Sequence, residues 1–295
     1  MTVSVLVPSS LTREAEDKRE ATRKLGYVAR AAAVFRVDRL VVFPDSGAEG
    51  QFGGGFVETV LRYAATPPYL RKEVWGRRDE LEYAGVLPPL RVTPRTGSGS
   101  DESGSLRQGI VTEVGSEGRV RVNCGLQHPV SLRVPDGTEL GEGERVTIRV
   151  SSRRPVRARI VDEPLPGFDV VTADLSTELS RDDAGVRVAT SRHGEQLTVT
   201  RLGEVVADAS ECGMTVAFGA PERGLPEILG VDADAVSAAS EGGGETEREL
   251  TASADDEPDG SRFDLWLNAV PNQGSGVVRT EEAMFAVLAC LSLTE

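Results

Sequence analysis

The amino-acid sequence contains the segment Val37-Asp38-Arg39-Leu40-Val41-Val42-Phe43, an apolar run that ends at Pro44-Asp45-Ser46-Gly47. A second apolar run, Val3 to Val7, lies upstream, and the residues from Thr12 to Phe35 between the two runs have a long helical pattern rich in Ala, Arg and Glu. Two buried strands joined by a helix of this length form a βαβ unit, which requires a parallel sheet. The segment therefore predicts an α/β fold.

The composition is that of a globular protein with an acidic surface. The chain has 295 residues, 39% of them hydrophobic, and a formal net charge of −14. This length accommodates one large domain or two smaller ones. No apolar run approaches the length of a membrane span, and the N-terminus lacks the pattern of a cleavable signal. We therefore expect a soluble, cytoplasmic protein with no membrane partner.

The basic residues are almost all arginine, since Lys18, Lys24 and Lys72 are the only lysines among 33 basic residues. Few lysines, many carboxylates and many small residues are typical of proteins that stay soluble at very high salt, where net charge is largely screened. We therefore expect a halophilic protein, in which local arginine clusters indicate partners better than the net charge does.

The sequence offers little material for metal chemistry. Cys124, Cys212 and Cys290 are far apart and form no CxxC pair, and His128 and His193 are the only histidines. These residues indicate neither a disulfide framework nor a zinc site, and they leave little for a Ser-His-Asp triad. We expect no metal site, and chemistry that uses an organic cofactor or carboxylate and arginine groups.

From about residue 90 the pattern changes to short alternating runs separated by glycine-rich turns. Five strands are predicted, within residues 109–114, 119–124, 128–134, 144–150 and 157–161. Five short strands in such a span predict a small closed barrel of the OB type, a fold often used on single-stranded nucleic acid. Its most basic surface comprises Arg145, Arg149, Arg153, Arg154, Arg157 and Arg159. This arginine face indicates nucleic-acid contact, although any small barrel can carry a solvated arginine face.

The composition also predicts the domain boundaries. Residues 1–89 and 164–295 are expected to form one discontinuous domain, and residues 90–163 an inserted OB-fold-like barrel that binds RNA. Residues 232–262 are acidic and rich in Ser, Ala and Gly, so we expect a solvated, mobile insertion without chemistry.

Three predicted strands in the second half each end in a shaped polar loop. These loops are Thr190–Gly194, Gly219–Pro226 and Ala269–Gly276. The carboxyl ends of neighbouring parallel strands lie on one edge of a sheet, so the loops can converge on one ligand. The third loop leads into a helix that Thr280 can cap, with Glu281 and Glu282 in its first turn. Taken alone, the third loop could also be an ordinary strand-to-helix connection.

These loops resemble those of the SPOUT class of RNA methyltransferases, particularly the archaeal and eukaryotic branch with an inserted OB-like barrel. The resemblance rests on Phe218-Gly219-Ala220-Pro221-Glu222-Arg223-Gly224-Leu225, on Asn268 to Glu282, on the turn Thr190 to Gly194 and on Gly26 to Asp38. It covers nearly the whole chain. The resemblance implies a SPOUT α/β domain with a C-terminal deep trefoil knot, and a homodimer whose site borders the subunit interface.

The resemblance also implies that S-adenosylmethionine binds in the knot. The cofactor-binding residues would be Thr190, Ser191, Gly194, Gly219, Glu222, Gly224, Leu225, Ala269, Val270, Pro271, Gln273, Gly274 and Val277. Arg30 matches an arginine that related enzymes place at the acceptor nucleotide, and we expect it to be catalytic together with Arg279 and Glu282. From the residues alone, Arg30 could instead reach the surface from a packed helix. Arg279 and Glu282 could likewise cap the helix and form ion pairs.

The leading hypothesis is S-adenosylmethionine-dependent methyl transfer to a base or ribose of structural RNA, either rRNA or tRNA. Such an enzyme mainly aligns donor and acceptor, while Arg30, Arg279 or Glu282 could lower the proton affinity of the acceptor. The third motif, Val277-Val278-Arg279-Thr280, departs from the Ser-Leu-Asn-like sequence of many relatives. The alternative is a catalytically silent RNA-binding or assembly protein that retains the fold. A nicotinamide-dependent enzyme is disfavoured because no GxGxxG follows the first strand.

Overall fold

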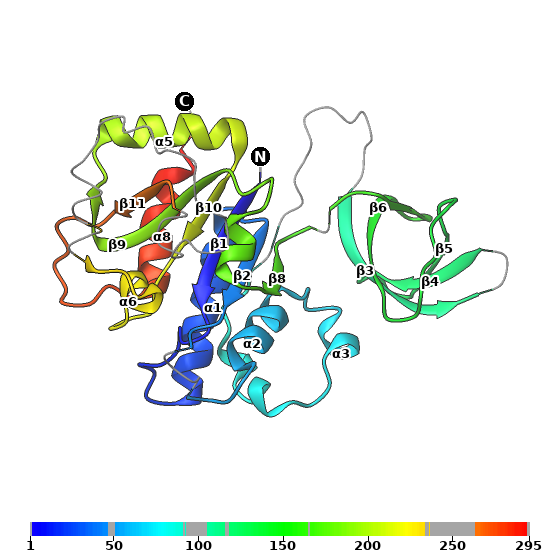
Figure 1. The fold of residues 1–295 in the computed structure, drawn as a ribbon. Helices are drawn as coiled ribbons and strands as arrows, with labels where there is room; N and C mark the ends of the chain where they lie inside the picture. The colour runs from blue at the N-terminus through cyan, green and yellow to red at the C-terminus, as the bar shows by residue number, and fades with distance from the viewer. Residues whose placement is uncertain are drawn as a thin grey trace. The chain divides into compact units, whose positions relative to one another are not determined.

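The computed structural model describes residues 2–46, 51–90, 92, 105–115, 118–164, 166–233, 236 and 263–293. The chain divides into two compact units, which Figure 1 shows as ribbons. The parallel-sheet unit comprises Met1–Arg62, Glu80–Leu90 and Asp169–Glu295, and the barrel unit comprises Tyr63–Asp79 and Arg91–Phe168. No helix in the described part of the chain is long and apolar enough to cross a membrane.

The parallel-sheet unit contains a six-stranded sheet in the order β11-β9-β10-β1-β2-β8, and every neighbouring pair is parallel. The strands are β1 (Val3–Pro8), β2 (Arg39–Phe43), β8 (Asp169–Thr172), β9 (Val186–Gln196), β10 (Met214–Ala217) and β11 (Leu265–Asn268). All of β1 and β10 is buried, as in sheets covered on both faces. The predicted α/β fold with a parallel sheet is confirmed.

The helices of this unit are α1 (Lys18–Val34), α2 (Phe56–Ala65, whose last residues belong to the barrel unit), α4 (Leu175–Leu179), α5 (Val199–Cys212), α6 (Leu225–Leu229) and α8 (Thr280–Leu291), with short 3-10 turns η1 (Asp79–Leu81) and η2 (Ala84–Val86). A side chain caps the start of α1 and of α5, whereas α4 and α6 have no such bond. The side chain of Asp17 accepts a hydrogen bond from the backbone N–H of Glu20, so α1 begins at Lys18 and not at Thr12.

The strand order changes direction at β1, and this arrangement places the functional loops. The chain runs from β1 to β2 and then β8 on one side, and it returns to β9, β10 and β11 on the other side. In parallel sheets, ligands bind beside the carboxyl ends of strands at such a switch point. Residues 190–194, which interrupt β9, and the loops after β10 and β11 are therefore neighbours at one edge of the sheet.

The barrel unit contains a five-stranded antiparallel sheet in the order β5-β4-β3-β6-β7. Its strands are β3 (Ser105–Val114), β4 (Arg119–Asn123), β5 (Val130–Arg133), β6 (Arg145–Arg153) and β7 (Val156–Val161), and α3 (Arg71–Val74) belongs to the same unit. The outer strands β5 and β7 lie close together, so the sheet is nearly closed into a barrel around an apolar core that includes Val122 and Ile148. Each of the five predicted strands is present.

Some expectations differ from the structure. The sequence pattern from Leu70 to Tyr83 predicts a short helix, but only α3 and the 3-10 turn η1 form there. Of the predicted insertion 232–262, only residues 232, 233 and 236 are described, and Val236 is buried in the apolar core of the parallel-sheet unit. The arginine face of the barrel is smaller than expected, because Arg149 is buried and forms an ion pair with Glu163.

Candidate functional site

The first loop of the site is an excursion inside β9. In the pairing of β9 with β11, Ala189 is paired with Trp266, and Glu195 is paired with the next residue, Leu267. Residues 190–194 are therefore an insertion in β9 that has no pairing partner in β11. A side chain at Gly194 would place its Cβ 2.7 Å from the carbonyl carbon and oxygen of Trp266. Glycine is required there because the excursion returns against backbone.

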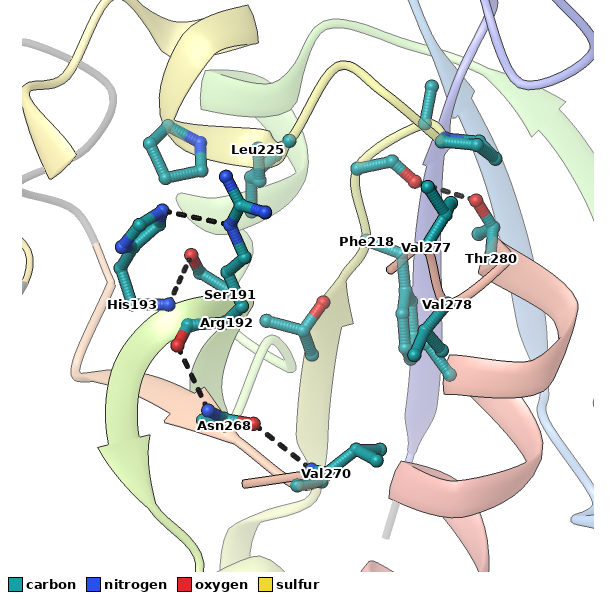
Figure 2. Close-up of a pocket in the computed structure, with 18 of the residues that line it drawn as sticks. Ser191, Arg192, His193, Phe218, Leu225, Asn268, Val270, Val277, Val278 and Thr280 are labelled. Carbon is teal, nitrogen blue, oxygen red and sulfur yellow. Dashed lines mark hydrogen bonds between the residues drawn. The ribbon is translucent and has the colours of Figure 1, made fainter. Parts of the chain in front are cut away.

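Asn268, the last residue of β11, connects the first loop to the third. Its side-chain Nδ2 donates to the carbonyl oxygen of Arg192 at 2.9 Å, and its Oδ1 accepts from the backbone N–H of Val270 at 3.0 Å. Figure 2 shows this pair of bonds beside the side chains of Ser191 and His193. One amide thus holds two loops that are far apart in the sequence.

The second loop is closed on itself. Ala220 and Arg223 exchange backbone hydrogen bonds, and Glu222 between them has a left-handed backbone with φ of 59°. The guanidinium of Arg223 donates to both carboxylate oxygens of buried Asp45, from Nε at 3.0 Å and from Nη2 at 3.2 Å. This bidentate pair anchors the loop to the end of β2.

The third loop is fastened to the second by Thr280. Its hydroxyl donates to the carbonyl oxygen of Gly219 at 2.8 Å (Figure 2). The expectation that Thr280 caps α8 is therefore wrong, since the N-cap position is Arg279. The carboxylate of Glu282 accepts from the backbone N–H of Arg279 at 2.9 Å, and this bond satisfies one of the free donors at the start of the helix.

The three loops surround a cavity of about 510 Å³. Most residues predicted to bind the cofactor line it, namely Thr190, Ser191, Gly219, Glu222, Gly224, Leu225, Ala269, Val270, Gln273 and Val277. Gly194, Pro271 and Gly274 do not line it. The volume lies in the range of small-molecule sites, about 300–1,000 Å³. The sequence-predicted loops therefore form one ligand-sized cavity.

A family model described as "Putative RNA methyltransferase" matches residues 2–291. The chain belongs to this family of RNA methyltransferases.

The chain has relatives that are similar to it over nearly its whole length. An uncharacterized protein of Haloarcula marismortui is 69% identical over 296 residues, which cover 100% of both chains. An uncharacterized protein of Halobacterium salinarum is 68% identical over 295 residues, again 100% of both chains. The 28S rRNA (uridine-N(3))-methyltransferase of Homo sapiens is 29% identical over 318 residues, which cover 98% of this chain and 77% of the human protein.

The lining of the larger cavity combines apolar side chains with a few charged groups. Phe218, Leu225, Leu267, Val270, Val277, Val278 and Val287 supply apolar surface, and Arg192, His193, Glu222 and Glu227 are the titratable side chains in the lining. The ring Nε2 of His193 accepts from Nε of Arg192 at 3.1 Å. Such walls suit a flat heterocycle with polar edges, which backbone groups of the loops can bind.

Several lining residues were not predicted from the sequence as ligand contacts. They are Arg192, His193, Asn268, Thr280, Val231, Ala233, Ala283 and Val287, among others. Arg192 and His193 belong to the quoted first loop, so the loop itself was a signal for them. Ala233 belongs to the segment 232–262, which the sequence predicts to be an insertion without chemistry. No sequence signal at Ala233 indicates a ligand contact, because the path of the chain after α6 brings this residue to the cavity.

Arg30 lies outside this cavity. Its Nη1 donates to the carbonyl oxygens of Pro89 and Leu90 at 3.0 and 3.2 Å. On the same helix, a Cβ at Gly26 would lie 2.5 Å from Cδ of Pro88, so the glycine allows the segment to approach α1 closely. Gly26 and Arg30 thus hold residues 88–90 against α1.

Arg279 and Glu282 line a second cavity of about 330 Å³ between α1 and α8. Its walls include Lys24 and Glu281, both nearly buried, and the Lys24 ammonium pairs with Glu14 and lies 4.0 Å from Glu281. Burial lowers the pKa of Lys24 to about 8, although the charge of Glu281 opposes the shift, and burial raises the pKa of Glu281. The structure therefore separates the three predicted catalytic residues from the cofactor residues.

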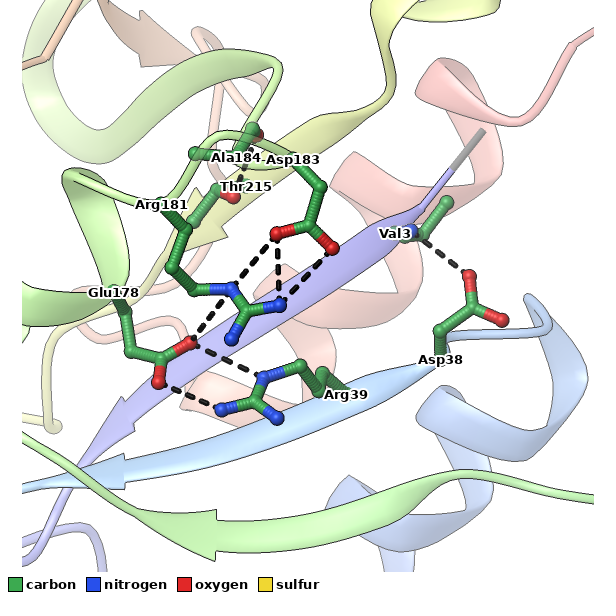
Figure 3. Close-up of polar contacts among 8 residues, drawn as sticks. All are labelled: Val3, Asp38, Arg39, Glu178, Arg181, Asp183, Ala184 and Thr215. Atoms are coloured by element: carbon green, nitrogen blue, oxygen red, sulfur yellow. Dashed lines mark hydrogen bonds and ion pairs between the residues drawn. The ribbon is translucent and has the colours of Figure 1, made fainter. Parts of the chain in front are cut away.

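At the amino-terminal edge of the sheet, opposite the cavity, a buried carboxylate is paired with arginine side chains. Glu178, which is 3% exposed, accepts from Nε of Arg39 at 3.2 Å and from Nη2 at 2.7 Å (Figure 3). Arg181 lies 3.8 Å from the same carboxylate and also pairs with Asp183. This network joins β2 to α4 and stabilises the fold away from the site.

Proposed function

We propose that the protein transfers a methyl group from S-adenosylmethionine to RNA and that the cofactor binds in the 510 Å³ cavity. The observation that carries this proposal is the convergence of three loops, connected by Asn268 and Thr280, around one cavity of ligand size. Membership of the RNA methyltransferase family supplies the reaction class.

The lining residues fit this cofactor. Leu225, Val270 and Val277 offer apolar surface for an adenine ring, and the glycines of the second loop leave its backbone groups accessible. Glu222 adds negative charge to the wall, which favours a cationic ligand. S-adenosylmethionine, when bound, supplies an electrophilic methyl group on a cationic sulfur.

For the acceptor we propose N3 of a uridine in ribosomal RNA. The support is the human relative, which covers both units of this chain and whose name states that reaction. N3 of uridine carries a proton that must leave when the methyl group is attached. The Glu222 carboxylate is a lining group that can accept it.

We also propose that the enzyme is a homodimer with a SPOUT-type knot formed by the loops around β10, β11 and α8, and that the barrel unit is OB-like and binds RNA. Arg30, Arg279 and Glu282 would then act on the acceptor from the partner protomer, because they lie apart from the cofactor cavity of their own chain. We further propose that the protein is halophilic, and its acidic composition, with arginine in place of most lysines, supports this.

Calorimetry with S-adenosylhomocysteine tests the cofactor site, and mass spectrometry of nucleosides after incubation with rRNA tests the reaction. We expect binding and formation of N3-methyluridine. Absence of binding by the wild-type protein would refute the cofactor site, whereas binding without methylation would favour a silent RNA-binding protein. Mixing Gly219→Ala and Arg279→Ala proteins should restore activity only if Arg279 acts across a dimer.

A further inference from the structure

Residues 63–79 precede the barrel strands in sequence and yet belong to the barrel unit. Three bonds fasten them to its sheet. Tyr69 donates its hydroxyl to the carbonyl oxygen of Gln108 in β3 at 2.9 Å, and Asn123 in β4 donates to Glu73 at 2.8 Å. The side chain of Arg145 in β6 donates to the hydroxyl of Thr66 at 3.2 Å. The segment is therefore a fixed part of the barrel surface.

Cationic side chains dominate the end of this segment, Arg71-Lys72-Glu73-Val74-Trp75-Gly76-Arg77-Arg78. Lys72, Arg77 and Arg78 are exposed, and none of the three forms an ion pair with a carboxylate among the described residues. In a chain with a formal charge of −14, exposed cationic side chains without an ion-pair partner in the described part of the chain indicate an anionic partner, although Glu73 and Asp79 offset part of their charge.

Aromatic rings lie among these cations. The guanidinium carbon of Arg78 is 5.3 Å from the ring centroid of Trp75, and Trp75 packs edge-on against Tyr63. The indole Nε1 of Trp75 donates to the hydroxyl of Thr66 at 3.0 Å, so the orientation of the half-buried ring is held. Because the orientation of the ring is already fixed, stacking a second flat group on it costs little conformational entropy.

Arg71 has a different role from its neighbours. It lies over the ring of Tyr63 at 4.5 Å and donates to the backbone carbonyl oxygens of Thr66 and Ala64 at 3.0 and 3.2 Å. Its donors are thus engaged inside the segment, where they support the Tyr63 ring behind Trp75. The groups left for a partner are Lys72, Trp75, Arg77 and Arg78.

Exposed guanidinium groups beside an oriented indole match single-stranded RNA, whose phosphates bind cations and whose unpaired bases stack on aromatic rings. An acidic peptide would use the cations but not the ring. At high salt the phosphate contacts weaken steeply, while stacking is retained. We propose that Trp75, Arg77 and Arg78, together with Lys72, form a binding site for single-stranded RNA on the barrel unit.

The proposal deepens the proposed function, because it identifies where the RNA substrate is bound outside the cofactor cavity. Trp75 and Trp266 are the two tryptophans of the chain, and Trp266 is buried in the other unit. In the full-length Trp266→Phe protein, fluorescence excited at a wavelength that tyrosine does not absorb therefore reports Trp75 alone. Oligouridine of about 12 nucleotides should quench this fluorescence saturably, and polyglutamate at equal charge should not.

Charge and stacking can be separated by substitution. Trp75→Ala should weaken binding about 5- to 150-fold, the equivalent of one base–aromatic stack of about 1–3 kcal/mol. The pair Arg77→Gln and Arg78→Gln should reduce the slope of log K against log salt by about 1.4, since each phosphate contact on a single strand contributes about 0.7. The matched control, Arg119→Gln with Arg133→Gln, removes the same charge from β4 and β5 and should change both quantities little.

Three results would overturn the site: absence of quenching, an equal loss of affinity in the control pair, or an unchanged KM for RNA in the Trp75→Ala protein and the Arg77→Gln, Arg78→Gln protein. In the third case the site is wrong even though methyl transfer stands. If Trp75 responds to RNA while the wild-type protein fails to bind S-adenosylhomocysteine, the proposed function fails and the RNA site stands.

Discussion

Replacing Gly219 by alanine tests whether the second loop shapes the cofactor cavity. A Cβ at this position would lie 2.5 Å from the backbone nitrogen of Leu225 and 2.9 Å from the carbonyl carbon of Gly224. These neighbours are backbone atoms, so no rotamer change relieves the overlap and the loop must open. Opening also strains the bond from Thr280 to the carbonyl oxygen of Gly219.

The expected effect on binding follows from the cost of this overlap. Inserting a methyl group into a closely packed region costs about 1–3 kcal/mol. The free protein can relieve the overlap by opening the loop, but a ligand that needs the closed loop must restore it. The cost then appears in the binding free energy, and affinity for S-adenosylhomocysteine should fall about 5- to 150-fold.

Gly274→Ala is the matched control for this substitution. Gly274 lies in the third loop, and a Cβ there would meet no atom within 4 Å. The same added methyl group should therefore change affinity less than about twofold, a free-energy difference below about 0.4 kcal/mol. Both variants should be compared with the wild type by titration calorimetry at a salt concentration where their circular dichroism spectra coincide.

The second loop does not shape the cofactor cavity if Gly219→Ala binds S-adenosylhomocysteine as tightly as the wild type, or if Gly274→Ala loses as much affinity. A fall in the free energy of unfolding of Gly219→Ala without a change in affinity would show that the loop contributes only to stability.

Asp45→Asn should lower the free energy of unfolding by about 3 kcal/mol in denaturant titrations, because it removes the charge that pairs with Arg223 at a buried site; an unchanged midpoint would contradict this. Thr280→Val should cost about 1–2 kcal/mol of stability, since it leaves the Gly219 carbonyl oxygen without this donor, and should also weaken S-adenosylhomocysteine binding. Burial lowers the pKa of Lys24 to about 8, so the folded protein releases its proton at lower pH than the unfolded chain, in which the pKa is about 10.4, and stability increases with pH between these values. From pH 7.5 to 9.5 the wild type should gain about 2 kcal/mol relative to Lys24→Met, and a pH-independent difference would show that Lys24 titrates normally.

The parts of the fold that could be predicted are those with local signals. Buried strands such as β1 and β2 appear as continuous apolar runs because both faces of a parallel sheet are covered. The loops after β10 and β11 were predicted because Gly and Pro cluster where these strands end. Residues 190–194 were predicted to follow a strand, but they form a loop inside β9, which continues to Gln196. The convergence of the loops could also be predicted, because one βαβ unit already indicates a parallel sheet, in which the carboxyl ends of neighbouring strands lie at one edge.

The parts that could not be predicted depend on distant partners. Thr280 has the residue type of a helix cap, but its hydroxyl binds the carbonyl of Gly219 in another loop. The helix predicted from Leu70 to Tyr83 ends at Val74. The next residue, Trp75, donates a hydrogen bond to Thr66 and packs against the ring of Tyr63. Arg149 counts as surface charge in the sequence, yet β6 turns it towards Glu163. No local pattern records these tertiary contacts.

Residues 276–282 form a wall shared by the two cavities of the parallel-sheet unit. Val277, Val278 and Thr280 line the larger cavity, whereas Arg279 and Glu282 line the cavity that contains Lys24. Any ligand that shifts the start of α8 through the Thr280 bond must therefore also move charged groups on the other side. Because that second cavity holds a buried ammonium between carboxylates, small displacements there change electrostatic energies more than they would at the surface. Binding in the larger cavity should thus be coupled to the protonation of Lys24, and S-adenosylhomocysteine affinity that stays constant from pH 7.5 to 9.5 would show that the wall is rigid.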